Sequence, residues 1–483
     1  MTTPHRVSGV MAPSNRTITG TMERSYNMKK TTTTRQVLPH VRPPRLAAAL
    51  LLAVCCASTL VAAPERGELV ACRIETDRGV VPADKPETAI VKVTLAADRV
   101  ASRERPPINL ALVLDRSGSM GGEKIARARE AAIAAIRRLD GRDMVSVVVY
   151  DHEVETLVPA QPARNSEWIE GRIAQITARG NTALFAGLSQ SASELRKNLD
   201  TGRINRAILL SDGLANTGPS SPDEVGRLGA ALMKEAIAVT TIGVGTDYNE
   251  DLMTRVSGNS DGNSYFVEKS DDLPAIFTKE LGDVLSVVAS RVRLTVRFRA
   301  GATPIECIGR DGRIVDNTVT VDLNQLYGGQ EKYLLIRVEL APGRDGETRL
   351  LADAEVNFED ATSRRSAQAT AAGRIRFSRD AREVAESVNV PVSREYTLNR
   401  NAQELDRAVR LADEGRKEEA ARVMRESAGR LEAAARSLDA PELEIEARRQ
   451  NVQADSIGSR GMGKAERKLI VTDNYMLYNQ QSK

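Results

Sequence analysis

The stretch INLALVLDRSGSM, residues 108–120, decides the fold of this 483-residue chain. Its first eight residues form an almost continuous apolar run that ends in Asp115, the pattern of a parallel strand buried on both faces. A loop with serines and glycines follows, and residues 123–139 then place apolar side chains at helical spacing. A strand, a polar loop and a helix in this order indicate an α/β domain with a parallel sheet.

The same alternation continues to residue 286. Strands are expected at 144–150, 206–212, 238–245 and 264–269, with an edge strand near 155–158. Helices are expected near 166–177, 183–199 and 222–236, from about 250, and at 273–285. Ser221 and Glu224 form a capping box around Pro222, which marks a helix start. We therefore predict a doubly wound, mostly parallel, Rossmann-like sheet over residues 107–286.

Two further kinds of structure flank this domain. In RVRLTVRFR, residues 291–299, apolar and arginine side chains alternate, so 290–378 predicts an antiparallel β-sandwich-like module. We interpret the arginines as a solvated strand face rather than a polyanion site. Residues 64–106 contain two or three strands, too few to stand alone, and we expect them to pair with that module.

The chain after residue 378 is expected to be partly helical. Residues 379–450 form a predicted helical hairpin region, in which 412–424 resembles the turn of a tetratricopeptide-type hairpin. A single hairpin cannot bury its own apolar face, so we expect it to dock on the β module. Residues 451–483 have mixed composition and are described only as a C-terminal tail.

The basic balance of the chain lies in its first 63 residues. They hold eight Lys or Arg and one acid, then run into the uncharged stretch 46–63, which we interpret as an export signal. A cleaved signal peptide and a retained N-terminal anchor both stay open, because Pro64 follows directly. The remaining chain has 60 basic and 64 acidic residues, a net charge of −4. We expect an exported protein of the periplasm or cell envelope, and a mildly acidic chain with 3% aromatic residues does not favour nucleic-acid binding.

Other chemistries have few candidate residues. His152 is the single histidine after residue 63 and is interpreted as a surface-loop residue, which leaves no His-rich zinc site. Cys72 and Cys307 can form one disulfide in an oxidising compartment, and two buried thiols fit equally well.

Residues 243–245 lack the third glycine of a dinucleotide loop. Asp261-Gly262-Asn263 lacks the spacing of a calcium loop and is interpreted as a turn.

Oxygen-bearing side chains gather at one edge of the predicted sheet. Asp115 ends the first strand of the α/β domain, and Ser117 and Ser119 follow in the loop. Asp212 ends the fourth strand, and Thr182 opens a helix whose preceding loop reaches the same edge. With strand order 3-2-1-4-5-6, the first and fourth strands flank the crevice where open α/β sheets bind ligands. Two carboxylates and three hydroxyls favour Mg²⁺, with Mn²⁺ or Ca²⁺ as substitutes, and leave one position for an external carboxylate.

The motif Asp115-x-Ser117-x-Ser119, with Thr182 and Asp212 further along the chain, resembles the metal-ion-dependent adhesion site of von Willebrand factor type A domains. All five motif positions are present, and the resemblance covers residues 107–286. The flanking segments are similar to those of exported bacterial proteins that carry this domain. The resemblance implies Mg²⁺-dependent binding of a protein ligand.

We therefore predict a non-enzymatic adhesion, scaffold or assembly protein whose partner presents a carboxylate to the metal. The alternative is a metal-dependent hydrolase that uses the same ion to activate water. Hydrolysis requires a base or second metal, and we expect no histidine or further carboxylate cluster in these loops. One charge-assisted contact contributes about 1.5 to 3 kcal/mol, whereas micromolar affinity requires about 8. Additional partner contacts are expected from Arg116, Met120, Phe185, Asn216 and Thr217.

Overall fold

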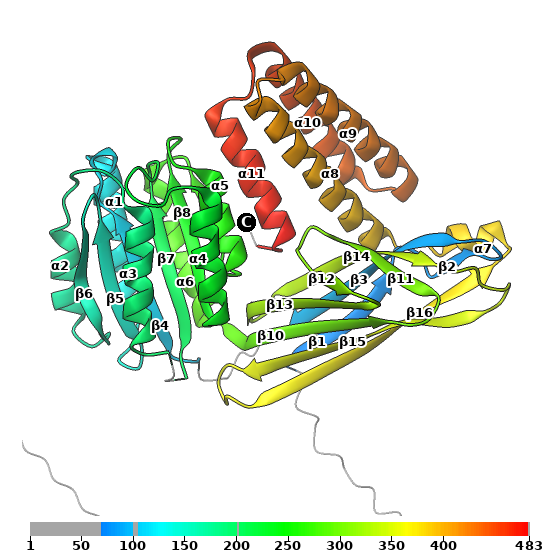
Figure 1. Ribbon diagram of the computed structural model, residues 1–483, viewed down its shortest axis with the longest axis horizontal. Helices are drawn as coiled ribbons and strands as arrows, with labels where there is room; N and C mark the ends of the chain where they lie inside the picture. The colour runs from blue at the N-terminus through cyan, green and yellow to red at the C-terminus, as the bar shows by residue number, and fades with distance from the viewer. Residues whose placement is uncertain (1–68, 100–104, 200–201, 482–483) are drawn as a thin grey trace, which may run out of the picture. The chain divides into compact units, whose positions relative to one another are not determined.

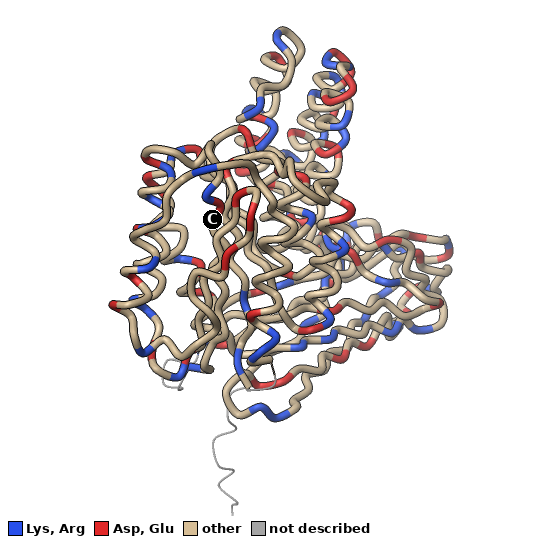
Figure 2. The backbone as a smooth tube through the Cα atoms, turned by 60° about the vertical axis from the view of Figure 1, so that its left-hand side comes forward, with Lys and Arg blue, Asp and Glu red and all other residues tan. Residues whose placement is uncertain are grey.

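The computed structural model describes residues 69–99, 105–199 and 202–481. The predicted export signal at 1–63, with its apolar stretch 46–63, lies outside the described residues. Within these ranges, no helix is both long and apolar enough to cross a membrane. Basic and acidic residues are interspersed along the described backbone (Figure 2).

Six strands form the sheet of the α/β domain, in the order β6-β5-β4-β7-β8-β9 (Figure 1). They are β4 (Ile108–Asp115), β5 (Met144–Tyr150), β6 (Val154–Pro162), β7 (Ile204–Ser211), β8 (Ile237–Val244) and β9 (Ser264–Val267). All neighbours are parallel except β6, which runs antiparallel to β5. Counted along the domain, this is the order 3-2-1-4-5-6, and the prediction of a doubly wound, mostly parallel sheet is confirmed.

Helices cover both faces of this sheet (Figure 1). Apolar residues of α1, α2 and α6 share one core with it, and those of α3, α4 and α5 share the core on the opposite face. The helices are α1 (Glu123–Ile136), α2 (Ser166–Ala174), α3 (Leu184–Arg196), α4 (Pro222–Lys234), α5 (Glu250–Asn259) and α6 (Leu273–Leu285). The predicted capping box at Ser221 and Glu224 is present at the start of α4. Because both faces are covered, the central strands are buried along their whole length.

The remaining strands form two antiparallel sheets that share one apolar core. One has the order β1-β3-β14-β11 and the other β12-β13-β10-β15-β16-β2, in which β2 alone pairs in parallel. The strands before the α/β domain are β1 (Val70–Thr76), β2 (Val80–Pro82) and β3 (Glu87–Ala97). Those after it are β10 (Val287–Phe298), β11 (Ala302–Ile308), β12 (Arg313–Val315), β13 (Thr318–Tyr327), β14 (Glu331–Leu340), β15 (Thr348–Asp360) and β16 (Ser366–Ser378). Since β3 pairs with β14 over ten residue pairs, the α/β domain is an insertion in one β domain.

No disulfide joins Cys72 to Cys307. Cys72 lies on β1 and Cys307 on β11, at opposite edges of the four-stranded sheet. With β3 and β14 between them and strands about 4.8 Å apart, the two residues are at least about 14 Å apart, beyond the reach of an S–S bond. Of the two alternatives that the sequence left open, the Cys72–Cys307 disulfide is therefore excluded. Backbone pairing between β3 and β14 joins the two segments instead.

The arginine stripe on β10 is neutralised by its neighbouring strands. Arg293 pairs with Asp322 of β13 at 2.6 Å, and Arg297 pairs with Glu355 of β15 at 3.1 Å. Arg291 and Arg299 likewise pair with acids of β15. The stripe is a solvated, charge-paired strand face, as predicted.

The chain after β16 is helical to its described end. Its helices are α7 (Ala381–Glu386), α8 (Val390–Asp413), α9 (Lys417–Leu438), α10 (Pro441–Arg460) and α11 (Lys464–Tyr478). The α8–α9 hairpin turns at Gly415, whose φ is 78°. On the β domain, α8 docks through Asn399, which donates to the Tyr333 hydroxyl at 3.1 Å. The second half of α10 and all of α11 thus lie in residues 451–483, for which the mixed composition gave no structural prediction.

The last helix, α11, lies between α8 and the α/β domain. On one side, Asn474 and Tyr478 donate to the two oxygens of Asp406 on α8 at 2.7 and 2.8 Å. On the other side, the hydroxyl of Tyr475 donates to the carbonyl of Gly262 at 2.6 Å. The side chain of Gln481, just beyond α11, bonds both the N–H and the C=O of Ser264, each at 3.0 Å. The C-terminal segment therefore caps the edge strand β9.

Candidate metal centre

Two neighbouring strands bring the candidate carboxylates together. Asp115 is the last residue of β4, and Asp212 follows the last residue of β7. The two strands pair in parallel with Leu114 opposite Leu210, so both aspartates lie at the carboxyl edge of the sheet. Ser119 lies in a short 3-10 helix, η1 (Gly118–Met120), in the loop that follows β4. The edge that the sequence singled out is the edge where these residues meet.

Hydrogen bonds link four of the five predicted residues. The Asp115 carboxylate accepts from the Ser117 N–H through Oδ1 and from the Ser211 hydroxyl through Oδ2, both at 2.7 Å. The hydroxyls of Ser117 and Ser119 are 3.0 Å apart. Ser119 in turn donates to Asp212 Oδ1 at 2.7 Å. The chain of contacts fixes the orientation of both carboxylates.

The fifth residue, Thr182, reaches the same place from a separate loop. The N–H of Gly118 donates to the carbonyl of Gly180 at 2.9 Å, which ties that loop to the loop after β4. A Cβ built on Gly213 would lie 3.2 Å from Ser119 Oγ and 3.5 Å from Thr182 Oγ1. The two hydroxyls therefore converge on the space over Gly213, which a larger side chain would fill.

The donor set fits a small, hard cation. Asp115 and Asp212 are fully buried, Ser117 and Thr182 are nearly so, and every donor is an oxygen. Burial raises the pKa of Asp115 to about 6, although the hydrogen bonds from Ser211 and Ser117 oppose this shift, and the nearby Asp212 adds to it. Two buried carboxylates side by side are costly unless a positive charge compensates them. A divalent cation among these oxygens would supply that charge.

One charged residue at this site was missed by the sequence reasoning. Lys124, in the first turn of α1, places its Nζ 2.5 Å from Asp212 Oδ2. Its side chain is 33% exposed, whereas Asp212 is fully buried. The available signal was position alone, because α1 begins directly after the serine loop and its first turn faces the same edge of the sheet.

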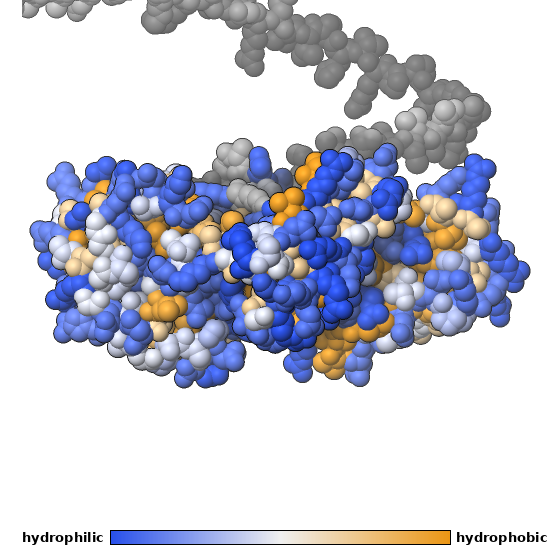
Figure 3. All heavy atoms as spheres, turned by 90° about the horizontal axis from the view of Figure 1, so that it is seen from above, coloured by the Kyte–Doolittle hydropathy of each residue, from blue (hydrophilic) through white to orange (hydrophobic). Residues whose placement is uncertain are grey.

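The rim of the site differs from the expected set of partner-contacting residues. Arg116 and Met120 are buried, and the Arg116 guanidinium pairs inward with Asp151 at 2.8 Å. The expectation that Arg116 and Met120 contact a partner is wrong, because both side chains are buried beneath the loop that carries them. Asn216 is exposed, and Phe185 and Thr217 are partly exposed. Leu214 was not predicted and is 59% exposed. The face of the molecule seen in Figure 3 is mostly hydrophilic, with apolar side chains at scattered places.

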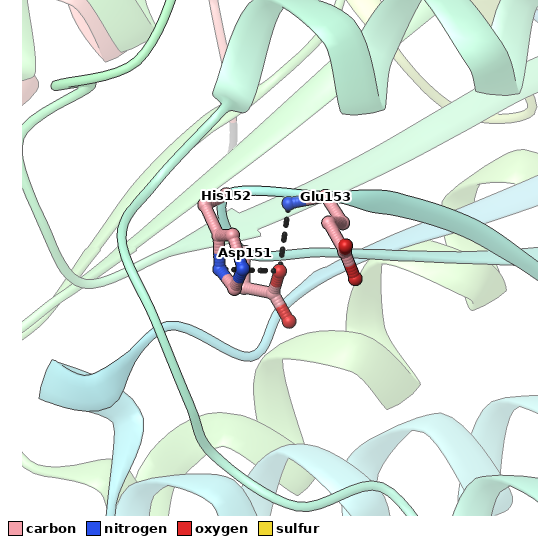
Figure 4. A group of neighbouring side chains, drawn as sticks. All are labelled: Asp151, His152 and Glu153. Carbon is pink, nitrogen blue, oxygen red and sulfur yellow. Dashed lines mark hydrogen bonds and ion pairs between the residues drawn. The ribbon is translucent and has the colours of Figure 1, made fainter.

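A second acidic cluster lies at the carboxyl end of β5 and consists of Asp151, His152 and Glu153 (Figure 4). The sequence led us to expect no histidine or further carboxylate cluster in the loops that carry the five predicted residues, and this cluster lies on the neighbouring loop. His152 Nδ1 lies 3.1 Å from Asp151 Oδ1, and the Glu153 N–H donates to the same oxygen. Asp151 Oδ2 accepts from Arg116 and Arg179, both at 2.8 Å. Although burial opposes it, these hydrogen bonds and charges lower the pKa of Asp151. Because two arginines already neutralise the Asp151 carboxylate, we interpret the cluster as a structural one that stabilises the loop after β5.

Comparison with known proteins identifies the domain. A family model described as the von Willebrand factor type A domain matches residues 109–279. The chain is 26% identical over 288 residues to the uncharacterized protein sll0103 of Synechocystis sp., covering 56% of this chain and 66% of that protein. It is 25% identical over 287 residues to the protein YfbK of Escherichia coli, covering 55% and 50%. Inter-alpha-trypsin inhibitor heavy chain H4 of Homo sapiens is 26% identical over 209 residues, covering 41% and 22%. The chain thus aligns with less than two thirds of each relative's length.

Solved structures share the fold over a larger part of the chain. A von Willebrand factor type A protein from Catenulispora acidiphila superposes with a TM-score of 0.62 at 17% identity, covering 81% of this chain and 89% of that one. The ArnB paralog VWA2 from Sulfolobus acidocaldarius gives 0.55 at 19% identity, covering 85% and 98%. At these identities the likeness concerns the fold alone. Together with the sheet order and the family match, it shows that this chain contains a von Willebrand factor type A domain.

Proposed function

We propose that this chain binds a protein partner through a divalent cation, most suitably Mg²⁺, held by Asp115, Ser117, Ser119, Thr182 and Asp212. When bound, the cation supplies a Lewis-acidic contact for one external oxygen ligand. The observation that carries the proposal is the convergence of five oxygen donors, from three loops, at the carboxyl edge of the sheet. A partner carboxylate is the ligand that best matches the charge and hardness of such a cation.

The residues of this chain would hold the cation and orient its open coordination position toward the partner. Asp115 and Asp212 provide buried negative charge, and the three hydroxyls provide neutral oxygens that do not quench the cation further. Ser119 is exposed, so the open side of the site faces solvent. Leu214 and Asn216 lie on the adjacent exposed loop and are available for partner contact. The domain occurs in relatives such as the inter-alpha-trypsin inhibitor heavy chains, which is consistent with a role in protein interaction.

Binding fits the surroundings better than hydrolysis. In the described part of the chain, the hydrogen-bond partners of these five side chains include no imidazole and no third carboxylate. His152 is on the neighbouring loop, where its Nδ1 faces Asp151 and its ring packs against Gly180. A metal-activated water would therefore lack a base within the site. The adhesion, scaffold or assembly role would be exercised outside the cytoplasm if residues 1–63 act as the export signal that their composition suggests.

The proposal is tested by metal-dependent capture. The immobilised protein is exposed to cell-envelope extract with Mg²⁺ or with EDTA, and bound proteins are compared by mass spectrometry. Wild-type protein is expected to retain a partner in Mg²⁺ that is absent in EDTA and absent from Asp212→Ala.

The matched control for this capture is Glu153→Gln. It removes an exposed carboxylate one loop away that pairs only with Arg179 among the described residues, and it is expected to behave as wild type. Equal capture by wild type and Asp212→Ala, or in Mg²⁺ and EDTA, contradicts the proposal. Phosphatase or esterase turnover that is lost in Asp115→Ala would favour the hydrolase instead.

A further inference from the structure

A lysine occupies one side of the candidate metal centre. The ammonium of Lys124 lies 2.5 Å from Asp212 Oδ2, while Ser119 donates to the other oxygen of the same carboxylate. Asp212 is fully buried, so this ion pair is screened little by water. The lysine therefore compensates one of the two buried carboxylates directly.

The surroundings keep this ammonium in place. The residue after β8, Gly245, has a φ of 71° and lies against the lysine, because a Cβ there would be 3.7 Å from Nζ. The loop that follows is in turn held by α11, since Lys468 donates to the carbonyl of Tyr248 at 2.8 Å and Lys464 pairs with Asp247 at 2.9 Å. Lys124 thus lies between the loops after β7 and β8, at the border of the site.

We propose that Lys124 is an internal cation that moderates metal binding and gives the loaded site its preference for anions. This inference rests on the proposed function. Two carboxylates and one ammonium leave the metal-free site with a net charge of −1, and a divalent cation brings it to +1. Without the lysine, the loaded site would be neutral. The excess positive charge opposes the metal and attracts an anionic partner, so metal and partner strengthen each other's binding.

The sign of the effect of removing the lysine follows from electrostatics. Its charge repels a metal bound to the same carboxylate. In the metal-free protein, its loss also leaves two buried carboxylates uncompensated, which a metal would relieve. Both effects favour metal binding in a variant that lacks the ammonium.

The test is a titration of MgCl₂ into metal-free protein by isothermal calorimetry at low salt. Lys124→Met, which keeps the length of the side chain without its charge, is expected to bind Mg²⁺ at least about tenfold more tightly than wild type. Lys124→Arg keeps the charge and is expected to stay within about threefold of wild type. Thermal melting gives an independent readout. Without metal, Lys124→Met is expected to have a lower melting temperature than wild type, and Mg²⁺ is expected to raise the melting temperature of the variant more than that of wild type.

The possible results separate this inference from the proposed function. If wild type and Lys124→Met bind Mg²⁺ with equal affinity, or the variant binds more weakly, the role of Lys124 is overturned while the metal site stands. If neither protein binds Mg²⁺, the proposed function itself fails, and the inference fails with it.

Discussion

The two carboxylates of the candidate centre differ in how their charge is compensated. Within the described part of the chain, Asp115 accepts hydrogen bonds from neutral donors, the Ser117 N–H and the Ser211 hydroxyl. Asp212 accepts from the Ser119 hydroxyl and from the ammonium of Lys124. Asp115 therefore carries the buried charge that most needs a cation, and its replacement should separate metal binding from stability.

Asp115→Asn is predicted to abolish Mg²⁺ binding without lowering the stability of the metal-free protein. The amide is nearly isosteric and removes the repulsion between two buried carboxylates, so the metal-free variant should be as stable as wild type or more stable by up to about 1 kcal/mol. Mg²⁺ should raise the melting temperature of wild type and leave that of the variant unchanged. Differential scanning calorimetry with and without Mg²⁺ measures both effects. A variant that still gains stability from Mg²⁺ would show that Asp115 is not a ligand.

A second residue-scale prediction concerns pH and lies outside the metal centre. Burial raises the pKa of Asp283 on α6 to about 6 from 3.8, and Glu280 adds to the shift. A carboxyl whose folded pKa is raised contributes stability below pH 3.8 that is lost as the pH rises through about 6. Asp283→Asn cannot suffer this loss and should be more stable than wild type by about 1 to 2 kcal/mol at pH 8, allowing for partial exposure. Urea denaturation at pH 8 and pH 4 tests this, since the gain should vanish at pH 4.

Residue spacing was enough to predict which oxygens gather at the site, because the ends of parallel strands must share one edge. It was not enough to predict charge compensation. The position of Lys124 directly after the serine loop was a weak signal, because only the folded chain shows that its ammonium reaches Asp212. Arg116 was misjudged for a related reason. Its neighbours in the motif face the metal position, but its own side chain turns under the loop to Asp151.

At the scale of elements, α11 connects the C-terminal helices to the loop beside the candidate site. Lys468 and Glu250 are both buried and form an ion pair, and Arg467 pairs with Glu250, Asp251 and Asp413. The ring of Tyr248 lies under the Lys468 ammonium, 4.4 Å away. This group of charges holds α11 against the start of α5.

Lys468→Met is predicted to destabilise the protein by about 3 kcal/mol, because it leaves a buried carboxylate short of one counter-charge. Lys464→Met is the matched control on the same helix. Its pair with Asp247 is exposed to solvent, so its loss should change stability far less than the loss of Lys468. Equilibrium unfolding in urea measures both. Equal losses in the two variants would mean that burial does not distinguish these ion pairs.

Helices and strands could be predicted where their buried residues form apolar runs or periodic apolar patterns in the sequence. They could not be predicted where the buried residues are polar. Strands β4, β7 and β8 are buried on both faces and could be read from their composition. The buried residues of α11 include Lys468, Thr472 and Asn474, so its packed face has no hydrophobic period. Apart from Ile470, which packs in the apolar core of the C-terminal helices, its contacts include buried charges and backbone carbonyls. No local pattern in residues 451–483 could indicate these polar contacts.

At the scale of the whole described chain, a buried polar junction joins the α/β domain to the β domain. Arg206 of β7 is fully buried and donates to Gln325 and Tyr327 of β13 at 2.7 and 2.6 Å. Asp261, in the turn before β9, accepts from Arg310 and Lys332 of the β domain at 2.9 and 3.0 Å. The turn expected at residues 261–263 is present, and its aspartate is an interdomain anchor.

Asp261→Asn is predicted to destabilise the protein by about 3 to 5 kcal/mol at pH 7, because Lys332 and Arg310 would remain buried without their counter-charge. The exposed Asp311, next to Arg310 in sequence, provides a control: Asp311→Asn should change stability by less than about 0.5 kcal/mol. Chemical denaturation followed by circular dichroism measures both values. A loss in Asp261→Asn no larger than in the control would exclude the proposed role of this junction.

The most direct test of the central claim is a calorimetric titration of Mg²⁺ into the metal-free protein. Wild type and Glu153→Gln are predicted to bind one Mg²⁺ per chain, and Asp115→Asn is predicted to bind none. The absence of binding to wild type at millimolar Mg²⁺, or equal binding by wild type and Asp115→Asn, would contradict the assignment of the cation to Asp115, Ser117, Ser119, Thr182 and Asp212.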